Sequence, residues 1–414
     1  MINDIMQKYD ICVLVGTNSQ GKSKILSNFK KNNNDNAILI SNEVKASEYI
    51  KNSASNSPLI QWLEKLIDIG EIQTKINEQL NSIKLDDIND ISNVNISLKS
   101  SAEDYKGLVS VNINTVSNKW EKPGSGETFL AELLLVRKML NPKIKNPIQY
   151  LIIDEPETFL HPSLFVKVAS ILKDISMYTK VLIATHSPSF LERFVTDLGS
   201  IAYVKNGETK LIPNNEECLE ILKKMPFYNK ILNYSDDELK TTKSCFKDIR
   251  GIINNFGSYF DVFLKPKIIH SLFAKTVVIG EGRAEKILFD CLKKEKGNTY
   301  LSDIEFIELY GKELMPYFAN LMAIIGIETI IIFDEDKNHT DEFNLGLNAE
   351  LHLLENISFD YDIENYLGIL RNKNDRNFKS IVSPISIYQL YFNRDKKVID
   401  LINKIDKKLL NSIK

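Results

Sequence analysis

The chain has 414 residues, which is enough for two or three domains, and it is 43% apolar and 26% charged. These proportions are typical of a globular protein and exclude a largely disordered chain. The formal net charge is −3 at pH 7, which excludes nucleic-acid binding through an overall positive field. Such binding would need a local basic patch or metal ions that neutralise phosphate.

The four cysteines, Cys12, Cys218, Cys245 and Cys291, lie far apart and form no CxxC pair. This usage is typical of the reducing cytosol and argues against structural zinc. The first ten residues are mixed and polar, unlike a signal peptide, and the apolar runs are too short to cross a bilayer. We therefore expect a cytoplasmic protein without a membrane partner.

The first half of the sequence predicts a parallel α/β sheet, because short apolar runs alternate with segments of helical spacing. The expected strands are residues 11–15, 37–40, 150–153 and 181–185. One helix is expected to begin at residue 22, and further helices are expected at residues 47–85, 128–140 and 163–178. Residues 94–98 and 108–113 alternate apolar and polar side chains, which predicts a hairpin-like layer.

The second half divides into a helical segment and another α/β unit. Residues 214–271 are mostly helical in pattern and rich in lysine, and we interpret them as a connector. Strands are then expected at residues 276–279, 306–309 and 329–333. The tail from residue 396 to 414 predicts a surface helix whose lysines form a solvated face. The predicted parts are therefore residues 1–213, 214–271 and 272–414.

A glycine-rich loop follows the first expected strand and opens the first expected helix. It fits G-x-x-x-x-G-K-[ST] in full, with the residues Gly16, Thr17, Asn18, Ser19, Gln20, Gly21, Lys22 and Ser23. Backbone amides of such a loop surround phosphates, Lys22 reaches the β- and γ-phosphates of ATP, and Ser23 ligates Mg²⁺. An ordinary glycine turn is the alternative for this string alone, but other motifs accompany it.

Two later strands of the same unit end in polar residues that suit ATP hydrolysis. Asp154 would hold Mg²⁺ through water and Glu155 would polarise the attacking water, with a solvated acidic turn as the alternative. His186 ends the next strand and is expected to sense the γ-phosphate, although a lone histidine there is often a surface residue. Ser125 and Gly126 precede a helix and offer amides to phosphate, which a helix cap would explain equally well.

These motifs, in this order, resemble the ABC-type ATPases of the OLD (overcoming-lysogenisation-defect) family. The resemblance rests on the glycine-rich loop, the Ser125 signature, and the segments IIDEPETFLHPSL and ATHSPSFL. It implies that the Ser125 signature caps ATP held on the loop of a second subunit, so that the protein is a homodimer or a higher oligomer. His161 would lie in the segment that crosses this interface.

Carboxylates also end two strands of the second α/β unit. Glu281 follows strand 276–279, Glu285 lies on the next helix, and Asp334 and Asp336 follow strand 329–333. Carboxylates at the C-terminal ends of neighbouring parallel strands converge on one crevice, and they suit Mg²⁺ or Mn²⁺. Two such ions activate water for phosphodiester cleavage. Surface turns are the alternative, because acids are common at strand ends.

The segment SLFAKTVVIGEGRAEKILF resembles the Toprim domain in its OLD-family form, which implies a nuclease. The later acidic residue of that domain matches Glu364 in DYDIENYLG, and Gly311 and Lys312 match a glycine-lysine turn. Lys312 joins Glu155, His186 and Glu281 as a candidate catalytic residue, with a contact to phosphate and a capping role both open. No counterpart of the family's late catalytic lysine is found in the sequence.

The predicted fold is α/β: an ABC-type P-loop ATPase domain, a helical connector, and a Toprim-like Rossmannoid domain with a helical tail. The resemblance implies an ATP-hydrolysing, divalent-metal-dependent nuclease of antiphage defence that cuts or nicks DNA. One alternative is an ATPase sensor or scaffold that acts with a separately encoded effector protein, and another is a toxin that cuts tRNA with the same carboxylates. A transporter subunit is disfavoured, because such subunits have no reason to carry a Toprim domain.

Overall fold

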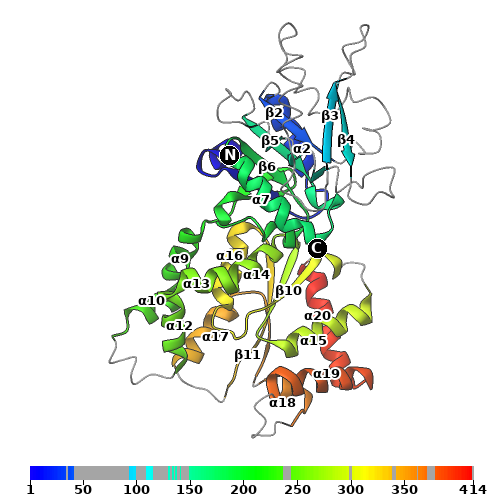
Figure 1. Ribbon diagram of the computed structural model, residues 1–414. Coiled ribbons are helices and arrows are strands. Elements are labelled where there is room, and N and C mark those ends of the chain that lie inside the picture. The colour runs from blue at the N-terminus through cyan, green and yellow to red at the C-terminus, as the bar shows by residue number, and fades with distance from the viewer. Residues whose placement is uncertain are drawn as a thin grey trace. The chain divides into compact units, whose positions relative to one another are not determined.

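The computed structural model divides the chain into two compact units, Met1–Leu211 and Ile212–Lys414, and each is described by itself (Figure 1). The residues described are 1–33, 36–41, 93–98, 109–114, 129–130, 133–134, 136–137, 140, 149–235, 244–297, 301–337, 342–360, 362–370 and 378–412.

A six-stranded sheet with the order β2-β5-β6-β1-β7-β8 forms the centre of the first unit. Its strands pair in parallel, except that β8 runs antiparallel to β7. A separate antiparallel pair joins β3 to β4. The strands are β1 (Ile11–Val15), β2 (Ala37–Ile40), β3 (Asn93–Leu98), β4 (Val109–Asn114), β5 (Tyr150–Asp154), β6 (Lys180–Ala184), β7 (Ile201–Lys205) and β8 (Glu208–Leu211).

Helices pack on this sheet through apolar side chains. They are α1 (Ile2–Lys8), α2 (Lys22–Asn32), α7 (Phe165–Ser176) and α8 (Pro188–Leu191), with 3-10 turns η2 (Pro156–Phe159), η3 (Pro162–Leu164) and η4 (Leu198–Ser200). Leu26 and Phe29 of α2 pack into a core with Leu14 and Leu182 of the central strands. The central strands are buried along most of their length, as expected for a parallel sheet covered on both faces.

The predicted α/β organisation of the first unit is confirmed by this sheet. Strands β1 and β2 have the predicted bounds, β5 and β6 flank helix α7, and β3 and β4 form the expected hairpin-like pair. The described residues between 129 and 137 are helical, as predicted. The predicted helix at residues 47–85 lies outside the described residues. The antiparallel strands β7 and β8 were not predicted.

The second unit contains a four-stranded, wholly parallel sheet with the order β10-β9-β11-β12. The strands are β9 (Thr276–Gly280), β10 (Ile304–Glu308), β11 (Glu328–Asp334) and β12 (Asn356–Phe359). The α-helices are α9 (Asn215–Lys224), α10 (Pro226–Asn233), α12 (Ser244–Asn254), α13 (Phe256–Tyr259), α14 (Lys265–Ser271), α15 (Arg283–Lys296), α16 (Met315–Ile325), α17 (Glu342–His352), α18 (Ile363–Leu367), α19 (Ser383–Phe392) and α20 (Lys396–Ser412). Shorter turns are the π-helical η5 (Phe260–Leu264) and η7 (Phe378–Val382) and the 3-10 turn η6 (Leu301–Asp303).

Helices cover both faces of this second sheet. Helices α15, α19 and α20 pack on one face, where side chains of all four strands join them in one apolar core. Helices α14, α16 and α17 lie on the other side of strands β10 and β11 (Figure 1). No helix in the described part of the chain is both long and apolar enough to span a bilayer.

The helices of residues 214–271 pack within the second unit. The Tyr317 hydroxyl of α16 donates a hydrogen bond to the Cys218 carbonyl of α9 at 3.1 Å. The Tyr228 hydroxyl of α10 donates to the Glu313 carbonyl at 2.7 Å, and the Phe227 ring contacts that of Phe343. The segment interpreted as a connector is therefore continuous with the sheet that follows it, while the three-part division of the chain stays a prediction.

Helix α20 is not a simple surface helix, and this corrects the sequence interpretation. Its apolar side chains, Val398, Leu401, Ile402, Ile405 and Leu409, are buried in the core against α15 and the sheet. The helical spacing of these residues was recognised correctly. The lysines occupy the opposite face, so the helix closes the domain core instead of lying on it.

Candidate functional site

The glycine-rich loop follows β1 and is held against the turn between β7 and β8. Gly16 has φ +146°, and a Cβ at this position would lie 2.3 Å from the Val204 carbonyl oxygen, so only glycine fits. The Gln20 carbonyl accepts a hydrogen bond from the Gly207 amide at 2.8 Å, and its side-chain oxygen accepts from the Asn206 amide at 2.6 Å. These contacts fix the path of the loop.

Lys22 is buried and its ammonium group lies among oxygen and nitrogen acceptors. Its Nζ donates hydrogen bonds to the Gly16 carbonyl at 2.7 Å and the Thr17 carbonyl at 3.1 Å, and lies 3.3 Å from His186 Nδ1. Burial lowers the pKa of Lys22 to about 8, opposed by the carboxylates of Glu155, Asp154 and Glu157. An anionic phosphate beside this loop would favour the charged form of the lysine.

Glu155 and His186 form the other wall of the same site. Glu155 has a left-handed backbone, with φ 52°, and its amide donates to the Ala184 carbonyl at 2.9 Å. Its Oε1 lies 3.2 Å from His186 Nε2. A left-handed backbone is uncommon in residues other than glycine, and the residues that adopt it are often found at functional sites. The fold therefore brings Lys22, His186 and Glu155 into one chain of contacts.

Glu157 was not singled out from the sequence, although it belongs to the same acidic segment. Its Oε1 accepts a hydrogen bond from the His186 amide at 2.5 Å. Burial is the main cause that raises the pKa of Glu157, and its Oε2 has no hydrogen-bond partner among the described residues. Glu157 thus holds the backbone of His186 in place. The sequence Asp-Glu-Pro-Glu shows this second glutamate, but its hydrogen bond with the His186 amide could not be predicted from the sequence.

The remaining predicted ATP-site residues occupy the expected elements. Asn18 and Ser19 lie in the loop, Gly21 precedes α2, Ser23 lies in its first turn, and Asp154 ends β5. Ser125 and Gly126 lie outside the described residues.

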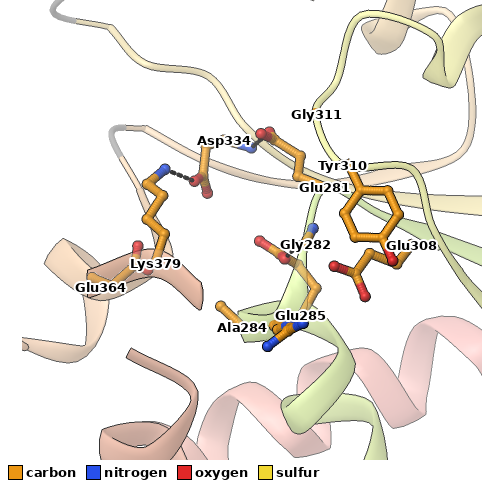
Figure 2. A pocket seen from close by; sticks show the side chains of 11 residues that line it. Glu281, Gly282, Ala284, Glu285, Glu308, Tyr310, Gly311, Asp334, Glu364 and Lys379 are labelled. Carbon is orange, nitrogen blue, oxygen red and sulfur yellow. Dashed lines mark hydrogen bonds and ion pairs between the residues drawn. The ribbon is translucent and has the colours of Figure 1, made fainter. Parts of the chain in front are cut away.

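The second site lies at the C-terminal end of the four-stranded sheet. Strand β9 has β10 on one side and β11 on the other, so the chain changes direction across the sheet at this point. In open parallel sheets ligands bind at such a switch point, outside the carboxyl ends of the strands. A cavity of about 510 Å³ opens there (Figure 2). Its lining comprises Glu281, Gly282, Arg283, Ala284, Glu285, Glu308, Tyr310, Gly311, Asp334, Glu364 and Lys379.

Backbone amides hold three of the predicted carboxylates in this cavity. Glu281 accepts a hydrogen bond from the Asp334 amide at 2.7 Å, so the ends of β9 and β11 are joined. Glu285 accepts from the Gly282 amide at 2.9 Å and caps α15. Asp334 accepts from the Ile363 amide at 3.1 Å, which connects it to the helix that carries Glu364.

The buried carboxylates of this cavity repel one another. Burial raises the pKa of Glu281, Glu285 and Asp334, and the neighbouring carboxylates raise each of them further. Glu364 is buried as well, and its Oε2 has no hydrogen-bond partner in the described part of the chain. Hard oxygen donors crowded in this way fit a divalent cation such as Mg²⁺ or Mn²⁺.

The cavity's side chains, as they stand, do not form a finished ligand set. Within the described residues, no group of three or more Asp, Glu, His or Cys side chains is arranged to hold a metal ion. Glu281, Glu285 and Asp334 each direct one carboxylate oxygen to a backbone amide. Their assignment as metal ligands stays a prediction.

Lys379 enters the cavity from η7, which the sequence did not indicate. Its Nζ lies 3.8 Å from Asp334 Oδ2 (Figure 2). Burial opposes the charge of Lys379, but attraction to Asp334, Glu364 and two other acids outweighs it and raises its pKa. The sequence contained no motif around this residue, and only the fold shows that a late lysine reaches the carboxylates.

Lys312 and Asp336 lie beside the cavity without lining it. Lys312 is buried, and its Nζ donates hydrogen bonds to the Asp334 carbonyl at 2.7 Å and to Asp336 Oδ2 at 2.9 Å. Asp336 has a left-handed backbone, with φ 48°. These contacts fix the turn after β11 and thereby the position of Asp334. The catalytic role of Lys312 and the metal role of Asp336 stay predictions.

Comparisons with known proteins match one family model to part of each unit of the chain. Residues 272–336 match the family model described as "Overcoming lysogenization defect protein-like, TOPRIM domain". Residues 57–192 match the model of an AAA domain described as "putative AbiEii toxin, Type IV TA system". The second match includes Asp154, Glu155 and His186 but begins after the glycine-rich loop. The chain is thus an ATPase domain joined to an OLD-like Toprim domain.

Two curated relatives carry the name endonuclease GajA. The protein of Bacillus cereus strain VD045 is 24% identical over 346 residues, which cover 81% of this chain and 51% of the relative. That of strain HuB5-5 is 24% identical over 248 residues, which cover 56% of this chain and 33% of the relative. The chain therefore matches about half or less of the length of these relatives.

Proposed function

We propose that this protein is an ATP-hydrolysing, divalent-metal-dependent nuclease that cuts or nicks DNA. The observation that carries the proposal is the cavity at the sheet switch point, where Glu281, Glu285, Asp334, Glu364 and Lys379 come together. The Toprim match and the relatives named endonuclease support it. A role in defence against phage or other foreign DNA is implied by the resemblance to the OLD family, and the cysteine usage supports a cytoplasmic location.

In the proposed cleavage reaction, acidic side chains and one lysine divide the work. Glu281, Glu285, Asp334 and Glu364 would hold Mg²⁺ or Mn²⁺, which, when bound, supplies Lewis acidity and lowers the pKa of coordinated water. Lys379 would pair with a phosphate oxygen and offset the charge that develops during cleavage. Lys312 would keep Asp334 in position by donating a hydrogen bond to the Asp334 carbonyl.

ATP is the proposed substrate of the first unit. Amides of the loop from Gly16 to Gly21 would bind its phosphates, Lys22 would pair with the β- and γ-phosphates, and Ser23 and Asp154 would hold Mg²⁺. Glu155 would accept a proton from the attacking water, because it directly follows the proposed Mg²⁺ ligand Asp154 and its carboxylate lies beside the His186 ring. The His186 ring contacts both Lys22 and Glu155, so a contact between this ring and the γ-phosphate would affect both side chains.

A homodimer is also part of the proposal. Ser125 and Gly126 of one subunit would contact the ATP held by Lys22 of another, so that ATP occupancy sets how the nuclease domains are presented to DNA. A separately encoded protein would be a further partner. Coupling of this kind requires that the dimer have two arrangements of its domains and that ATP bind these arrangements with different affinity.

The test is to incubate the purified protein with supercoiled plasmid, linear duplex DNA and tRNA, each with and without Mg²⁺ and ATP. We expect metal-dependent nicking or cutting of DNA by the wild type and none by Glu281→Gln. The variant Glu328→Gln is a matched control, because Glu328 is exposed at the opposite end of β11 from Asp334. Cleavage of tRNA alone would redirect the assignment to an RNA toxin, and no cleavage of any substrate would favour a scaffold role.

A further inference from the structure

Tyr310 is an exposed aromatic residue on the wall of the carboxylate cavity. Its side chain is 67% exposed, yet it lines the same cavity as Glu281 and Asp334. Figure 2 shows its ring beside Glu308, on the opposite side of Glu281 from Lys379 in this view. A large aromatic ring that remains accessible next to a charged pocket is an available contact surface for a flat ligand.

The backbone at Tyr310 is held in an unfavourable conformation. Tyr310 has φ 58°, a left-handed value that bulky side chains seldom adopt, and Gly311 follows with φ 132°. The Gly311 amide donates a hydrogen bond to the Glu281 carbonyl at 2.9 Å, and the Leu309 amide donates to the Gly280 carbonyl at 3.1 Å. The turn is therefore fixed directly to the strand end that carries Glu281, and the ring keeps a set position relative to the carboxylates.

Lys267 supports the ring from helix α14. Its Nζ lies 4.7 Å from the centroid of the Tyr310 ring, and it also donates a hydrogen bond to the Glu308 carbonyl at 2.5 Å. A cation placed over an aromatic ring attracts its π-electrons and fixes its orientation. Helix α14 belongs to the segment interpreted as a connector, so that segment contributes a side chain that contacts a residue of the cavity wall.

We propose that Tyr310 is a stacking platform for an unpaired nucleobase next to the phosphodiester bond that is cut. The inference rests on the proposed nuclease function. With a phosphate beside Lys379 and the carboxylates, the adjoining base is the flat, apolar group available to cover the ring. Aromatic side chains bind single-stranded bases in this way with little sequence preference, because each base offers a π-face. The preferred substrate would be single-stranded DNA or a base displaced from a duplex.

Three substitutions of Tyr310 distinguish the effect of the aromatic ring from the effect of the strained backbone. Tyr310→Phe keeps the ring, whereas Tyr310→Gly and Tyr310→Asn remove it and place residues that tolerate a left-handed backbone. We expect Tyr310→Phe to bind a fluorescent single-stranded oligonucleotide within about twofold of the wild type. We expect the other two to bind it roughly 5- to 150-fold more weakly, with no loss of thermal stability and an unchanged ATPase rate.

The cleavage arm uses single-stranded DNA, blunt duplex DNA, and a single strand with one abasic position moved along it. An abasic position beside the cleaved bond should slow the wild type and have no further effect on Tyr310→Gly. Equal binding and cleavage by wild type, Tyr310→Gly and Tyr310→Asn would overturn the platform while leaving the nuclease intact. A wild type that cuts neither these DNAs nor supercoiled plasmid would instead remove the proposed function itself, and the platform with it.

Discussion

The two sites of this chain hold buried charges of opposite sign. At the glycine-rich loop a single lysine, Lys22, is buried, and burial lowers its pKa to about 8. In the Toprim cavity five carboxylates line the pocket, and the pKa values of Glu281, Glu285 and Asp334 are raised. Each shift disfavours the charged form, so each site gains from a ligand of opposite charge: an anion at the loop and a cation at the cavity.

The backbone supports these charges in complementary ways. Carbonyl oxygens of Gly16 and Thr17 accept hydrogen bonds from Lys22, whereas backbone amides donate to Glu281, Glu285 and Asp334. Both sets of hydrogen bonds are local to the ends of strands. Substitutions that remove charge but keep shape should therefore weaken a ligand far more than the fold, and they should do so at one site without the other.

The largest effect is expected at the cavity. Glu281→Gln or Asp334→Asn should lower DNA cleavage on the order of a thousandfold, because removing a ligand charge loses several kcal/mol of metal-dependent stabilisation. ATP turnover should stay near the wild-type rate. Both activities are measured on the same preparations, together with Mg²⁺ binding by calorimetry. If ATP hydrolysis were lost together with DNA cleavage, the two sites would be one functional unit and not two independent sites.

Hydrolysis at the loop should depend almost as strongly on Glu155. The amide in Glu155→Gln keeps the shape but cannot accept a proton from water, so ATP hydrolysis should fall roughly a hundredfold or more. ATP binding should be retained, and the variant should accumulate as an ATP-bound dimer in size-exclusion chromatography. Steady-state turnover and filter binding give the two numbers. Hydrolysis at the wild-type rate would assign the catalytic carboxylate elsewhere.

Removing the buried lysine should affect affinity instead of turnover. Lys22→Ala deletes charge-assisted hydrogen bonds to the β- and γ-phosphates and should weaken ATP binding roughly a hundredfold. Lys24→Ala is the matched control, because Lys24 is exposed on the same helix. Calorimetric titration of both variants distinguishes the roles. Equal ATP affinity in Lys22→Ala and the wild type would refute the loop assignment.

The smallest predicted effect separates the two lysines of the second unit. Lys379→Gln should lower cleavage about tenfold or more with little change in stability, because its side chain is half exposed. Lys312→Met should instead destabilise the fold by about 1–3 kcal/mol, since it leaves the Asp334 carbonyl and the Asp336 carboxylate without their buried partner. Urea denaturation and cleavage rates are compared. A stable Lys312→Met protein with no cleavage would make Lys312 the catalytic lysine.

Local motifs explain how much of this arrangement was predictable. The α/β organisation, the ATP site and the carboxylate crevice were predicted from glycine-rich turns and strand-end acids, and the Toprim assignment came from a resemblance of short segments. Lys379 was missed because its approach to Asp334 depends on the folding of a π-helical turn far along the chain. The burial of α20 was missed because its spacing reveals an apolar face without revealing what covers that face.

The hydrogen bonds between Gln20 and the β7–β8 turn offer a practical use. Any shift of the glycine-rich loop on nucleotide binding would be transmitted to Asn206 and Gly207, which lie outside the phosphate site. Glu208 follows on the exposed rim of the same hairpin. Cys12, Cys218 and Cys291, the cysteines whose side chains are described, are all buried. An environment-sensitive dye on a cysteine introduced at Glu208 would convert this hairpin into a fluorescent reporter of nucleotide exchange.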